Sequence, residues 1–145
     1  MLDDIPREQL DPILFNALRA IYRFQQSKMT AFGLDYEDIY LLQLLMNHTP
    51  QRMGEIADEM GIPISTATRV VDRLEEKKLL SRKKDPRDKR NILVTLEQKG
   101  KDVVTKVENQ TYQILSKNLS NYTDEDITSF YKTAINLHKI LDVSS

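Results

Sequence analysis

The stretch MGEIADEMGIPISTATRVVDRLEEKK, residues 53–78, contains two helical patterns separated by a short turn. The first, residues 53–60, has the apolar spacing of an amphipathic helix, and its predicted inner face consists of Met53, Ile56, Ala57 and Met60. The second, residues 64–78, has a predicted inner face that consists of Ala67, Val70, Val71 and Leu74. Two helices joined by a tight turn that contains glycine predict a helix-turn-helix, whose second helix can enter the major groove of DNA.

The second helix of this motif carries side chains that suit DNA contacts. They are Ser65, Thr66, Thr68, Arg69 and Arg73. Hydroxyl groups donate to or accept from base edges, and a guanidinium forms paired hydrogen bonds with guanine or phosphate. The alternative is that Ser65 and Thr66 only cap the helix and Arg69 is a solvated surface charge.

After this helix the apolar pattern changes from helical to extended. Residues 79–84, LLSRKK, and residues 91–96, NILVTL, predict two short strands, and the DPRD sequence between them supplies the turn. An arginine at the tip of such a hairpin can place its guanidinium in a minor groove. The candidate DNA contacts of the hairpin are Arg87, Lys89 and Arg90.

The turn of the hairpin also contains two acids, Asp85 and Asp88. These carboxylates can pair with Arg90 or Lys89 and stiffen the loop. Arg87 would then point outward. The alternative is that the whole basic loop is only a solvated face of the protein.

Charge is distributed unevenly along the chain. The 145 residues have a formal net charge of -1. Residues 62–90 contain 10 cationic and 5 anionic side chains, which leaves 11 cations and 17 anions for the rest of the chain. The middle of the chain is therefore at +5 and the remainder at -6, so a polyanion would bind the middle.

The motif and the hairpin together resemble the winged helix-turn-helix of the multiple antibiotic resistance regulator (MarR) family. The strongest match is DPRDKRNILVTLEQKG, residues 85–100, which resembles the family's wing signature. The matching positions are Asp85, Arg87, Asp88, Arg90, Thr95 and Gly100. One departure is Pro63, where the family more often has Ser or Thr, so we expect the second helix to lack a side-chain N-cap.

The remaining sequence predicts more helices around the winged motif. The predicted helices are residues 8–30, 36–47, 95–119 with Thr95 as N-cap and Gln98 in a capping box, and a last helix from Thr123. NHTPQR, residues 47–52, is predicted to be a turn. The expected fold class is mainly α with a small β-hairpin wing, a winged helix-turn-helix flanked by N- and C-terminal dimerisation helices.

The resemblance implies a homodimer in which the first and last helices of two subunits intertwine. We expect residues 1–35 and 115–145 to form the helical dimerisation region and residues 36–114 to form the DNA-binding domain. Apolar stripes near both termini support this expectation independently, because a small winged domain cannot cover both by itself. The alternative is an intramolecular helical hairpin.

The composition also argues against several classes of protein. The chain has no cysteine, no Gly-rich phosphate loop and only two distant histidines, His48 and His138, so neither an enzyme nor a cofactor or metal site is expected. An acidic N-terminal segment without an apolar core, and no apolar run long enough to cross a bilayer, lead us to expect a cytoplasmic protein.

The expected function is that of a DNA-binding transcriptional regulator, most often a repressor in this family, which binds double-stranded DNA as a homodimer. The resemblance also implies release by a small, often aromatic effector. The candidate lining residues are Tyr22, Phe32, Tyr40, Met46 and His48, each of which suits the core equally well. The alternatives are a winged-helix module that binds a protein without DNA, and a small-molecule-binding protein without DNA.

Overall fold

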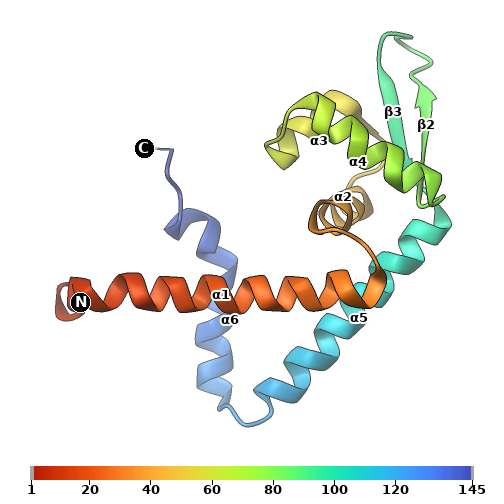
Figure 1. The fold of residues 1–145 in the computed structure, drawn as a ribbon. Helices are drawn as coiled ribbons and strands as arrows, with labels where there is room; N and C mark the ends of the chain where they lie inside the picture. Colours follow the sequence, from red (N-terminus) through yellow and green to blue (C-terminus); the bar gives the residue numbers. More distant parts are fainter. Residues whose placement is uncertain (1, 145) are drawn as a thin grey trace. The chain divides into compact units, whose positions relative to one another are not determined.

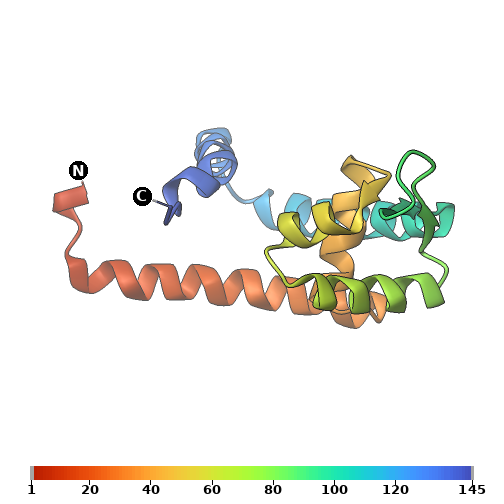
Figure 2. The ribbon, with the colours of Figure 1, turned by 90° about the horizontal axis from the view of Figure 1, so that it is seen from above.

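A computed structural model describes residues 2–144 of the chain (Figure 1; Figure 2). It is mostly helical, with one small antiparallel sheet, which confirms the predicted fold class. Its elements in chain order are η1 (Leu2–Asp4), α1 (Arg7–Phe32), α2 (Tyr36–Asn47), β1 (Gln51–Arg52), α3 (Met53–Met60), α4 (Ile64–Glu76), β2 (Leu80–Lys84), β3 (Ile92–Leu96), α5 (Gln98–Leu119) and α6 (Asp124–Ile140). They form two compact units, residues 1–107 and residues 108–145.

Two glycines end the helices that precede α2 and α4. Gly33 follows α1 with a φ of 62°, and Gly61 follows α3 with a φ of 63°, both in the left-handed region that glycine adopts without strain. The helix α4 then begins after Pro63, which provides no side-chain cap, as the sequence predicts. Gly33 thus separates α1 from α2, and Gly61 separates α3 from α4, the two helices of the predicted motif.

The sheet has the strand order β1-β3-β2. Ser81 of β2 pairs with Thr95 of β3, and Gln51 of β1 pairs with Val94. Two predictions are wrong here. Part of the NHTPQR segment is a strand and not a turn, because Gln51 and its neighbour pair with β3. Thr95 is also a strand residue and not an N-cap, because its pairing with Ser81 continues β3 to Leu96, and α5 begins at Gln98.

The helix α4, the second helix of the motif, is two residues shorter than predicted, since it ends at Glu76. Lys78 has a φ of 62°, which no helical residue adopts, and this reverses the chain toward β2. The amide of Leu79 donates to the Leu74 carbonyl at 3.0 Å, which satisfies a carbonyl at the end of the helix.

One apolar core holds the first unit together. The predicted inner face of α4 is confirmed, since Ala67, Val70, Val71 and Leu74 are each at most 1% exposed. These side chains join a buried cluster with α2, α3, both longer strands and the start of α5. Gly100 makes this packing possible, because a Cβ there would lie 2.2 Å from the Leu79 carbonyl oxygen.

The second unit contains the C-terminal part of α5 and the helix α6. The last helix is predicted to start at Thr123, and Thr123 is the N-cap of α6: its hydroxyl accepts from the Asp126 amide at 3.1 Å, and its own amide donates to the Asp126 carboxylate at 3.3 Å. No side chain of α6 is buried, although Phe130, Tyr131 and Ile135 are large and apolar. Among the described residues, no helix is long and apolar enough to span a membrane.

Candidate nucleic-acid interface

The outward face of α4 is fixed by the side chains that it buries. Because the inner face packs into the core, the candidates Ser65 and Arg69 are exposed, and Thr66 and Thr68 are partly exposed. The hydroxyl of Thr68 donates to the Ile64 carbonyl at 2.8 Å, so its oxygen lone pairs remain for accepting a hydrogen bond. These four side chains therefore belong to one helix and reach solvent together.

Arg73, the fifth candidate on α4, has partners within the protein. Its Nη2 lies 2.7 Å from the Asp38 carboxylate and 3.8 Å from that of Asp35, both near the start of α2. Asp38 is only 1% exposed, and its hydrogen bond raises the pKa of the Arg73 guanidinium. Arg73 thus links α4 to α2, a structural role that local sequence pattern does not reveal, because Asp38 lies 35 positions away in the chain.

Arg82 belongs to the basic stretch, yet it holds β2 against α4. Its guanidinium lies 3.0 Å from Glu75 Oε1 and 2.8 Å from Asp72 Oδ1, and its amide donates to Glu75 Oε2 at 3.1 Å. The hydrogen bond from Arg82 holds the pKa of the Glu75 carboxyl below its usual range. This cluster sets where the wing begins relative to α4.

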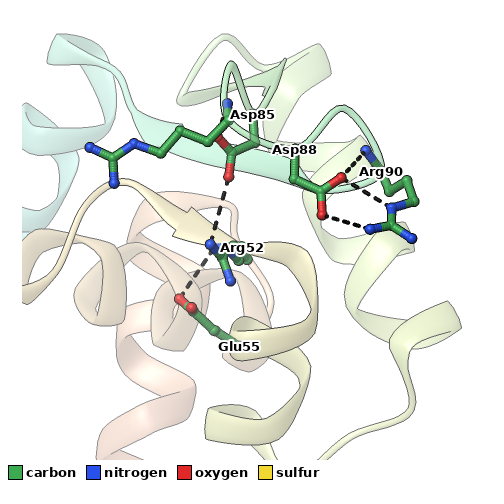
Figure 3. Close-up of polar contacts among 6 residues, drawn as sticks. Arg52, Glu55, Asp85, Asp88 and Arg90 are labelled. Carbon is green, nitrogen blue, oxygen red and sulfur yellow. Dashed lines mark hydrogen bonds and ion pairs between the residues drawn. The ribbon is translucent and has the colours of Figure 1, made fainter.

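The turn of the wing is organised by its two carboxylates (Figure 3). Asp85 is buried; its Oδ1 accepts from the Arg87 amide at 2.9 Å, and its Oδ2 lies 3.8 Å from Arg52 Nη2. Asp88 accepts from the amide and side chain of Arg90, which confirms one predicted pair and lowers the pKa of Asp88. The Arg52 contact was not predictable locally, because Arg52 and Asp85 lie 33 positions apart in the chain.

Arg52 also connects the wing to the helix-turn-helix. It precedes α3, and its amide donates to the Glu55 carboxylate at 3.3 Å (Figure 3). The side chain then reaches Asp85, so the start of α3 and the wing turn share one contact. Beyond these ties, the wing presents exposed cations for which the described residues supply no ion-pair partner: Lys83, Lys84, Arg87 and Lys89.

The effector candidates do not line one cavity. Tyr22 lines an apolar groove of about 400 Å³ along α1, together with Leu18, Ile21, Gln25, Gln26, Met29 and Tyr36. His48 lines a different, polar hollow of about 440 Å³ at the wing base, together with Pro50, Arg52, Glu55, Asp85, Pro86, Arg87 and Leu93.

The other three effector candidates have their own surroundings. Phe32 packs against the core, Met46 is exposed, and the Tyr40 hydroxyl donates to the Glu59 carbonyl at 3.5 Å. Within residues 2–144, the structure contains no group of three or more acidic or histidine side chains that could hold a metal ion.

Comparison with known proteins agrees with this geometry. Residues 34–92 match the model of the MarR family. The HTH-type transcriptional regulator YsmB of Bacillus subtilis is 30% identical over 96 residues, which is 66% of this chain and 66% of YsmB. The HTH-type transcriptional regulator MgrA of Staphylococcus aureus is 23% identical over 76% of each chain. A solved MarR family protein from Bacillus stearothermophilus has the same fold, with a TM-score of 0.79, 24% identity and coverage of 94% of this chain and 99% of its own.

Proposed function

The chain belongs to the MarR family of transcriptional regulators, which bind DNA through a helix-turn-helix, and on that premise we propose that it represses transcription as a homodimer on a pseudopalindromic operator. The observation that carries this proposal is the outward face of α4, where hydroxyls and Arg69 reach solvent beside a wing whose turn is held by Asp85. Its known relatives are regulators and not enzymes.

In the proposed complex the start of α4 enters a major groove, and the wing lies over the neighbouring minor groove. Ser65, Thr66 and Thr68 face base edges, and Arg69 forks onto a guanine or a phosphate. Arg87 enters the minor groove, while Lys89 and Arg90 bind phosphates. Arg73 contributes mainly by holding α4 in place, because its guanidinium is bonded to Asp38.

We propose residues 1–35 and 115–145 as the dimerisation region, with 36–114 as the DNA-binding domain. Exposed apolar side chains support this assignment: Ile13, Leu14, Leu18 and Ile21 on α1, and Phe130, Tyr131, Ile135 and Ile140 on α6. Stripes of this kind are unusual on a monomer and suit a twofold interface. Sedimentation should give the mass of two chains, and Phe130→Glu should shift it toward one; a wild-type monomer at micromolar concentration would refute the dimer.

We propose that a small aromatic effector releases the protein from DNA. The effector would bind the DNA-incompetent conformation more tightly than the DNA-competent one, and the difference between these two affinities sets how far DNA affinity falls. The groove of about 400 Å³ that Tyr22 lines is the favoured position among the five effector candidates, because its walls are mostly apolar. The proposal predicts that Tyr22→Ala weakens effector binding and leaves operator affinity unchanged. Loss of both together would instead indicate a structural role.

The DNA-binding proposal is tested by the salt dependence of binding to a random duplex. A protein that neutralises several phosphates loses affinity steeply between about 50 and 200 mM salt. Arg69→Ala should weaken binding and reduce this slope, whereas Lys106→Ala, which removes an exposed charge from α5, should do neither. Binding that is absent or insensitive to salt would favour the alternative, a winged-helix module that recognises a protein.

A further inference from the structure

Ile64, the first residue of α4, is a large apolar side chain that the protein leaves 58% exposed. It does not belong to the core cluster, and it is not among the partly buried apolar residues packed against that cluster, although its neighbour Ile62 is. An aliphatic side chain that stays in water does not gain the free energy of apolar burial. A β-branched residue is also no better than serine as a helix former. Packing and helix propensity therefore do not explain Ile64.

The surroundings of Ile64 on α4 favour a contact with DNA. Thr68 lies four residues later and hence on the same face of the helix. Its hydroxyl proton is directed to the Ile64 carbonyl, 2.8 Å away, so Thr68 can offer an incoming base only lone pairs and its methyl group. Ser65 and Arg69, both exposed, flank this small apolar area with polar groups.

The major groove has one apolar group that such an area fits. Thymine carries a 5-methyl group on the groove side, and no other base of unmodified DNA does. Residues at the start of a recognition helix are also the ones that reach base edges. We propose that Ile64 is a specificity-determining residue that contacts a thymine methyl group in each half-site, an inference that rests on the DNA-binding function proposed above.

The size of the effect follows from the free energy of burying one methyl-sized group, about 0.8 kcal/mol, which corresponds to about a fourfold change in affinity. A dimer that makes the contact in both half-sites would show up to about sixteenfold. The experiment uses a duplex selected by the full-length protein from a random pool. It is synthesised once with thymine and once with deoxyuridine, which lacks the methyl group but keeps its hydrogen-bonding groups.

The wild type should bind the thymine duplex about four- to sixteenfold more tightly than the deoxyuridine duplex. Ile64→Ala should bring this ratio close to one, and Ile64→Val should give an intermediate value. Ile92→Ala is the matched control, because it removes an isoleucine that is 40% exposed on the wing, and it should keep the wild-type ratio.

The outcomes separate this inference from the function on which it rests. A wild type that binds the selected duplex with a ratio of one, or an Ile64→Ala variant that keeps the wild-type ratio, overturns the inference and leaves DNA binding intact. In that case Ile64 faces water or a protein partner. A wild type that selects no duplex at all overturns the proposed function as well. Because Ile64 is exposed, Ile64→Ala should unfold at the same temperature as the wild type, and Ile64→Val provides the same test with a smaller change.

Discussion

The two arginines on the solvent side of α4 should behave differently when each is replaced by alanine. Arg69 is exposed and makes no ion pair within the described residues, whereas Arg73 is bonded to the buried carboxylate of Asp38. Arg73→Ala leaves that buried carboxylate without its cation. Arg69→Ala removes a solvated charge, so the free energy of unfolding should change by less than about 0.5 kcal/mol.

The expected loss for Arg73→Ala can be bounded from the geometry. Removing one partner of a fully buried ion pair costs about 3–5 kcal/mol. The Arg73 side chain is 40% exposed, so water can reach the site and solvate part of the remaining charge. Reducing the cost in proportion to this exposure gives an expected loss of about 2–3 kcal/mol in the free energy of unfolding, close to the penalty for an unsatisfied charged hydrogen-bonding group.

Urea unfolding followed by circular dichroism, at one fixed protein concentration, measures both variants. The double variant Asp38→Leu with Arg73→Met removes the charge and its partner together, so it should recover part of the lost stability. It should also keep most of the DNA affinity if Arg73 acts through the fold, whereas Arg69→Ala should not. Equal stability of Arg73→Ala and Arg69→Ala would contradict a structural role for the ion pair of Arg73 with Asp38.

Three further outcomes follow from the contacts. Gly100→Ala should lower the free energy of unfolding by about 2–3 kcal/mol, because its Cβ would overlap a backbone carbonyl. Gly54→Ala on α3 meets no atom within 4 Å and should raise the free energy of unfolding by about 0.5–1 kcal/mol. Equal melting temperatures for these two variants would contradict this. Arg82 depresses the pKa of Glu75, so the stabilisation is present above the ordinary glutamate pKa and disappears as the pH falls through the lowered value. Glu75→Gln should therefore be less stable than wild type at neutral pH and equally stable in acid, as thermal unfolding at several pH values would show. Arg87→Ala should weaken operator binding by about 1–3 kcal/mol in an anisotropy titration with unchanged stability, and an unaltered affinity would exclude a groove contact.

Local sequence pattern predicted most of the fold, because the bounds and buried faces of the helices depend on residues only a few positions apart. The helices α2 and α3 begin and end as the sequence predicts, and the four apolar residues of α4 point into the core. Each of these features depends only on the spacing of apolar residues and on a terminating glycine or turn. The family's wing signature also includes Gly100, whose role becomes visible only once the Leu79 carbonyl lies against it.

Long-range pairings could not be predicted in this way. The strand β1 has only two residues, so nothing in its own sequence distinguishes it from a turn until β3 pairs with it. Thr95 looks like a helix cap by its spacing to Gln98, but its strand pairing with Ser81 decides its conformation. The ion pair between Arg73 and Asp38 joins residues 35 positions apart.

The cations of the basic stretch therefore have two roles. Some are bonded to carboxylates within the protein and hold the site in place, and others are exposed and available to bind DNA. Arg82 fixes the wing to α4 through Asp72 and Glu75, so not all ten cations of residues 62–90 are free to release counterions from DNA. Arg69, Lys83, Lys84, Arg87 and Lys89 are the exposed cations of α4 and the wing for which the described residues supply no ion-pair partner. If all five bind phosphate, each subunit should contribute a salt slope of about 4.5, and replacing Arg82 should alter affinity by moving the wing without lowering that slope by a full unit.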